Sequence, residues 1–129
     1  MEPHHLPPQD AQMVLRGWQE ERRLIHFHIS DNANPSFKCS GIGTIEELSP
    51  ETLRIDGRNV MDEASNGKYY GCTISLQRAN SFTLWDWRNI PPEEKLMKEL
   101  LQDTYDTAVT IALGPARCML FSMKRRDEL

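Results

Sequence analysis

Two histidines have the spacing that comes closest to a metal site. His26 and His28 stand at i and i+2 in an alternating apolar run, 24–29, so on a strand both imidazoles project from one face. A transition-metal site needs a third ligand, and no Cys-x-x-Cys pair, His-x-x-x-His pair or acidic cluster supplies one in sequence. Polar histidines on the outer face of an amphipathic strand explain the same pattern. We therefore predict no metal and no cofactor, and keep a metal-dependent enzyme built on His26 and His28 as an outside hypothesis.

The tripeptide Trp85-Asp86-Trp87 is the most distinctive aromatic feature. On a strand both indoles face one side of the sheet and Asp86 faces the other. One interpretation is structural, with both tryptophans packed under the second of two predicted helices. The other is functional, with the indoles forming a platform for a base or another flat ligand.

Basic residues gather at two places, near the end of the first predicted helix (Arg16, Arg22 and Arg23) and in the tail at 124–126. Either group could contact phosphate, although cations also suit the C-terminal end of a helix. The net charge of -4 argues against a protein that coats nucleic acid through a general positive field, but it allows a local basic patch.

Motifs for covalent catalysis and for phosphate binding are absent from the chain. It contains no G-x-S-x-G, no S-x-x-K and no G-x-x-x-x-G-K-[ST], and Gly41-Ile42-Gly43 lacks the third glycine of a dinucleotide loop. The adjacent acids Glu46-Glu47 would point to opposite faces of a strand, which suits solvent better than acid–base catalysis. The pattern favours binding over enzymatic chemistry and leaves the enzyme question open.

Hydrophobic periodicity indicates which elements position these residues. Ala11, Val14, Leu15 and Trp18 repeat at helical spacing and predict a helix over 9–22, while the prolines in 1–8 predict a flexible lead-in. A second helix is expected at about 92–104, after Pro91-Pro92. Alternating runs predict strands at 24–29, 37–48, 53–55, 70–77, 82–87, 107–113 and 117–123, with hairpin turns at 78–81 and 114–116.

Short links between successive strands favour antiparallel pairing. The expected fold is therefore mainly β with two helices: a small antiparallel bent sheet or barrel with an N-terminal helix and a second helix before a C-terminal hairpin. The 129 residues form one predicted domain, since no linker or repeat divides them. Three scattered cysteines, no leader pattern and no apolar run of about 20 residues predict a cytoplasmic protein with reduced thiols and no membrane partner.

Three segments of residues 9–75 resemble a known family. They are Gln9-Asp10 at a helix start, Gly43-Thr44-Ile45-Glu46-Glu47-Leu48 and Tyr70-Gly71-Cys72-Thr73-Ile74-Ser75. Together they resemble the Sm-like (Hfq-type) small β-barrels. The resemblance implies a bent barrel, ring assembly through strand edges and RNA binding with Gln9 as a contact. The Lys-His pair that lines the family's uridine pocket falls on Gly71-Cys72, so that pocket chemistry is missing here.

These observations leave three functional hypotheses. The first is a non-enzymatic small β-barrel binding or interaction module, with homo-oligomers formed through strand edges and an unknown partner. The alternative is an Sm-like RNA-binding protein, and the outsider is the metal-dependent enzyme. For RNA or another ligand the candidate binding residues are Gln9, Arg16, Arg22, Arg23, Trp85 and Trp87.

Overall fold

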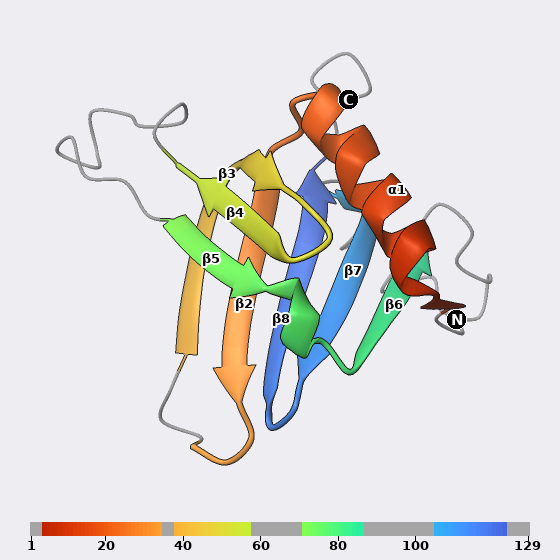
Figure 1. Ribbon diagram of the computed structural model, residues 1–129. Coiled ribbons are helices and arrows are strands. Elements are labelled where there is room, and N and C mark those ends of the chain that lie inside the picture. Colours follow the sequence, from red (N-terminus) through yellow and green to blue (C-terminus); the bar gives the residue numbers. More distant parts are fainter. Residues whose placement is uncertain (1–3, 35–37, 58–70, 87–104, 124–129) are drawn as a thin grey trace, which may run out of the picture.

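The computed structural model describes residues 4–34, 38–57, 71–86 and 105–123 (Figure 1). In these residues one α-helix and eight strands follow one another along the chain. They are β1 (His4–Leu6), α1 (Pro8–Glu20), β2 (Ile25–Asp31), β3 (Lys38–Leu48), β4 (Thr52–Asp56), β5 (Gly71–Ser75), the 3₁₀ turn η3 (Leu76–Arg78), β6 (Ser81–Asp86), β7 (Tyr105–Leu113) and β8 (Ala116–Met123).

The eight described strands form one antiparallel sheet in the order β1-β6-β7-β8-β2-β3-β4-β5. Strands β2 to β5 form one meander and β6 to β8 another, and the pairing of β8 with β2 joins them. The ends of this order, β1 and β5, are not paired with each other. The sheet is therefore strongly curved but open (Figure 1).

Helix α1 lies across the inner face of the sheet, over β6 and β7, while β4 and β5 curl over β2 and β8 (Figure 1). It starts at Pro8, where a missing N–H costs nothing, and the Pro7 carbonyl accepts the N–H groups of Asp10 and Ala11. Its apolar stripe enters the core between helix and sheet. The fully buried members of that core include Leu15, Ile25, Phe27, Leu53, Ile55, Val109, Ile111 and Leu120.

Strand β3 passes from one part of the sheet to the other, and two glycines permit the close approach this requires. Up to Gly43 it pairs with β2, and from Thr44 it pairs with β4. A Cβ atom on Gly43 would lie 2.5 Å from the Asp56 carbonyl oxygen, and one on Gly41 would lie 2.6 Å from the Phe27 ring. The sequence predicts a bulge or bend at these glycines, and the register shift itself lies between Ile45 and Glu47.

We expect Gly43→Ala to lower the free energy of unfolding by about 1–3 kcal/mol, because the obstacle is backbone rather than a movable side chain. The matched control is Gly17→Ala in α1, where a Cβ meets nothing within 4 Å. That change should stabilise the helix by about 0.5–1 kcal/mol. Urea unfolding measures both. If Gly43→Ala were as stable as the parent, the close approach of β3 to the Asp56 backbone would be contradicted.

Two features of the expected fold are wrong: the sheet does not close into a barrel, and one of the predicted hairpins is absent from the described residues. The predicted hairpin around 78–81 does not form, because β5 pairs with β4 whereas β6 pairs with β7 and β1. A short link predicts pairing only when the chain reverses on itself. Here η3 turns the chain, and the buried Leu76 anchors it, so the link leads from β5 at one edge of the sheet to β6, the strand next to the other edge. The result is an open sheet.

The number of helices is also corrected. In the described part of the chain α1 is the only helix of seven or more residues, and the second helix expected at 92–104 lies outside the described residues. Within the predicted lead-in, His4–Leu6 form β1 on the edge of β6, because Pro7 and Pro8 follow the short strand rather than interrupt it. The N-terminal helix, the antiparallel pairing and the C-terminal hairpin through Gly114 are confirmed.

Candidate functional site

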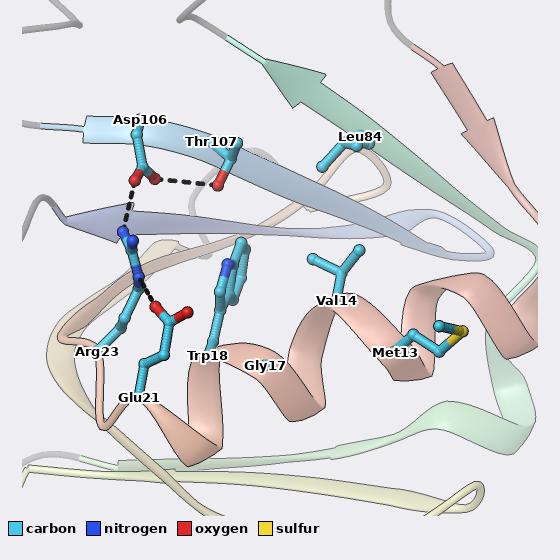
Figure 2. Close-up of a pocket in the computed structure, with 9 residues that line it drawn as sticks. All are labelled: Met13, Val14, Gly17, Trp18, Glu21, Arg23, Leu84, Asp106 and Thr107. Atoms are coloured by element: carbon cyan, nitrogen blue, oxygen red, sulfur yellow. Dashed lines mark hydrogen bonds and ion pairs between the residues drawn. The ribbon is translucent and has the colours of Figure 1, made fainter.

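A cavity of about 240 Å³ lies between α1 and strands β6 and β7, on the inner face of the sheet (Figure 2). We call it the inner cavity. One side is apolar, with Met13, Val14 and Trp18 from the helix facing Leu84 from β6. The other end is polar and is lined by Glu21, Arg23, Asp106 and Thr107, with Gly17 between the two regions.

The polar end is organised around the Arg23 guanidinium. Its Nη1 lies 2.5 Å from Asp106 Oδ2, and its Nε lies 2.7 Å from Glu21 Oε2 (Figure 2). The side chains of Arg23 and Asp106 are only 10% and 8% exposed, whereas that of Glu21 is 46% exposed. Burial alone would lower the pKa of Arg23, but hydrogen bonds and charges from Glu21 and Asp106 raise it above its ordinary value. The arginine is held in its charged form.

Secondary contacts fix the orientation of this ion pair. Arg23 Nη1 also donates to the hydroxyl of the fully buried Ser122 at 3.2 Å and to the Met123 carbonyl at 3.4 Å. The Thr107 hydroxyl donates to the second carboxylate oxygen of Asp106 at 3.1 Å. The ion pair therefore ties the end of α1 to strands β7 and β8, and its charges face the cavity from fixed positions.

The turn after α1 explains why two neighbouring arginines differ. Arg22 adopts a left-handed backbone conformation with φ of 54°, and the next N–H, that of Arg23, returns to the Trp18 carbonyl at 3.0 Å. This reverses the chain, so Arg22 stays exposed while Arg23 turns inward. The sequence predicts both as parts of one basic group near the end of the first helix, and the structure separates them.

The apolar side contains open space beside a large aromatic ring. Trp18 is 7% exposed and stands in the cavity wall, while Met13 at the mouth is 72% exposed. Gly17 lines the cavity, and a Cβ there would meet nothing within 4 Å. A cavity of about 150 Å³ is known to hold a benzene-sized molecule. One small ring with a short polar arm is the size of ligand that fits.

The predicted binding residues do not form one site. Gln9, Arg16 and Arg22 are exposed on or just after α1, and Arg23 lines the inner cavity. Trp85 lies on the opposite, outer face of the sheet, where its indole N–H donates to the Thr110 hydroxyl at 3.1 Å. Trp87 lies outside the described residues. The arginines and the aromatic platform therefore belong to different surfaces.

His26 and His28 share the outer face, as their spacing predicts. Their ring centroids are 4.3 Å apart, and His26 Nδ1 lies 2.7 Å from the Tyr105 hydroxyl. Phe121 contacts His28 edge-on, with centroids 5.7 Å apart. Within the described ranges, no group of three His, Cys, Asp or Glu side chains is placed to hold a metal ion. The pair is packed as part of an aromatic cluster.

We expect His26 to titrate below its ordinary pKa of 6.5, because burial and then the nearby His28 charge disfavour its protonated form. A depressed histidine pKa means that the unfolded chain binds more protons, so stability falls as pH drops from about 6.5 through the folded-state value. Proton NMR of the imidazole signals measures the midpoint. Replacing His28 with alanine should move it upward, and a midpoint above 6.5 in the parent would contradict this arrangement.

Sequence reasoning missed Asp106, the central carboxylate of the inner cavity. Strict alternation of the core positions Thr107, Val109 and Ile111 would direct Asp106 to the outer face. A register shift makes Asp106 the extra residue, because Tyr105 pairs with Met123 and Thr107 already pairs with Ser122. A bulge changes the direction of a side chain without leaving a signal in the hydrophobic pattern.

No family model, no curated protein and no solved structure matches this chain. In the described part of the chain, α1 is neither long nor apolar enough to span a membrane.

Proposed function

We propose that this chain is a non-enzymatic binding module whose inner cavity takes a small amphipathic amine. The observation that carries the proposal is the division of the cavity into an apolar side and a charged end. A ligand's ring would pack against Trp18, Val14 and Leu84, and its head would reach Asp106 and Glu21. Small-molecule sites typically combine such an apolar wall with a few fixed polar groups.

Charge selects the head group. Two carboxylates and one guanidinium line the polar end, so its described ionisable groups carry one excess negative charge. Both carboxylates already contact Arg23, and an ammonium group beside them would complete a balanced set of charges. The Trp18 indole adds a second attraction, because a cation close to an aromatic face is stabilised by about 0.5–2 kcal/mol.

The residues of the cavity favour binding over turnover. Its described lining contains no histidine, cysteine or lysine that could serve as a base or nucleophile, and the Thr107 hydroxyl donates a hydrogen bond to Asp106. Glu21, Arg23 and Asp106 are engaged with one another. Groups held in this way are suited to positioning a charge rather than transferring a proton.

Three probes of matched shape test the proposal: phenethylammonium, 2-phenylethanol and 3-phenylpropionate. Two-dimensional NMR titrations should show the ammonium probe binding about tenfold more tightly than the carboxylate, with the alcohol between them. The shifted signals should lie in α1, β6 and the start of β7. Tighter binding of the carboxylate, or no shifts at these elements with any probe, would refute the proposal.

A further inference from the structure

A second concavity, of about 300 Å³, lies on the outer face of the sheet across strands β1, β6, β7 and β8. We call it the outer groove. Its floor is made of side chains that face away from α1 on four adjacent strands. One row across the strands is His5, Thr83, Thr110 and Met119, and the next is Ser81, Ala112 and Arg117.

Trp85 supplies an aromatic wall at one end of the outer groove. The residue opposite it on β7 is Ala108, but its indole N–H bonds to Thr110, two positions further along that strand. The ring therefore leans toward the groove, and the hydrogen bond holds it there. Trp85 is partly exposed, so its surface is accessible to a flat ligand. Stacking of a base on such a ring contributes strongly to affinity and tolerates different bases.

The Arg117 guanidinium supplies a positive charge to the same groove. Arg117 and His5 are both exposed, and neither side chain has a hydrogen bond or ion pair with another described residue. No carboxylate is among the described residues that line the groove. The guanidinium is therefore available to a planar anion such as phosphate, which it can bind through paired N–H groups. Ser81 and Thr83 add two hydroxyl groups to the lining of the groove.

We propose that the outer groove binds an aromatic ring that carries a phosphate, with the ring on Trp85 and the phosphate at Arg117. A free nucleoside monophosphate and the phosphorylated end of an RNA strand share this chemistry. The proposal is separate from that for the inner cavity, because the two sites lie on opposite faces of the sheet and carry opposite excess charge. Either can hold if the other fails.

Calorimetric titration with adenosine 5′-monophosphate, adenosine and inorganic phosphate tests the proposal. The monophosphate should bind at least tenfold more tightly than either fragment. Arg117→Ala should weaken the monophosphate about tenfold and leave adenosine unchanged, since it removes a charge-assisted contact to phosphate alone. Trp85→Leu should weaken both, whereas Trp85→Phe should retain most of the affinity because it keeps an aromatic ring.

Two further variants serve as controls. Arg22→Ala removes an exposed arginine away from the groove, and Gly17→Leu fills the inner cavity; neither should change nucleotide affinity. A 5′-phosphorylated hexa-adenylate distinguishes the sources. If the hexa-adenylate binds only as tightly as the monophosphate, the ligand of the groove is a free nucleotide. If it binds more than tenfold more tightly, and Trp85→Leu and Arg117→Ala each abolish this gain, the ligand is the end of an RNA strand. The proposal would be overturned if no nucleotide binding were detected. It would also be overturned if folded Arg117→Ala and Trp85→Leu both bound the nucleotide and the oligonucleotide as tightly as the parent.

Discussion

Replacing Asp106 with alanine is expected to lower the free energy of unfolding by about 3–5 kcal/mol, the usual cost of leaving a buried charge without its partner. Arg23 would remain, with a side chain only 10% exposed, after losing the carboxylate that lies 2.5 Å from its Nη1. The lost contact also joins the end of α1 to β7. Urea unfolding monitored by circular dichroism measures the change.

Two comparisons make this expectation specific. Glu21→Ala removes the other carboxylate from the same guanidinium, but that side chain is 46% exposed, so the cost should be about 0–1 kcal/mol. Exchanging both members of the buried pair, as Arg23→Met with Asp106→Leu, should recover much of the stability lost in Asp106→Ala. If Asp106→Ala cost no more than Glu21→Ala, Arg23 would not depend on the buried carboxylate.

Gly17→Leu is expected to abolish binding of phenethylammonium to the inner cavity while leaving the fold as stable as the parent or more so. The residue lines the cavity, and the space beside its Cα is open, so a leucine side chain would occupy the volume proposed for the ligand. Leucine also has a better helix propensity than glycine, by roughly 0.5–1 kcal/mol. Loss of binding would therefore not result from loss of structure.

Arg16→Leu is the matched control for this variant. It introduces the same side chain at the adjacent helical position, which is exposed and does not line the cavity. We expect its affinity for the ammonium probe to equal that of the parent, while affinity in Gly17→Leu falls more than tenfold. Calorimetry measures the affinities, and thermal unfolding reports stability. Parent-like affinity in Gly17→Leu would place the probe somewhere else.

The elements that follow regular periodicity were predictable from sequence. Ala11, Leu15 and Trp18 repeat at helical spacing and do form the buried stripe of α1, and Ile25 and Phe27 alternate with the outward His26 and His28. These patterns depend only on which face of an element is buried. The open sheet was not predictable in this way, because periodicity does not show that η3 leads from β5, at one edge of the sheet, to β6, the strand next to the other edge.

The inner cavity depended on two local deviations from regular geometry. The left-handed turn at Arg22 directs Arg23 inward, and the bulge at Asp106 turns a carboxylate toward the core. Residue type predicts neither deviation, because arginine rarely adopts a positive φ and aspartate is usually exposed. Trp85 was recognisable as an aromatic candidate. Its hydrogen-bond partner Thr110, on β7, and Arg117, which lines the same groove from β8, come together with it only through the sheet topology.

The most direct test of the central claim is a two-dimensional NMR titration of phenethylammonium into the parent protein and into Gly17→Leu. We expect saturable shifts at Val14, Trp18, Leu84 and Thr107 in the parent, and their loss in a folded Gly17→Leu variant. Shifts that persist in Gly17→Leu, or that map to the outer face around Trp85, would contradict the inner cavity as the binding site.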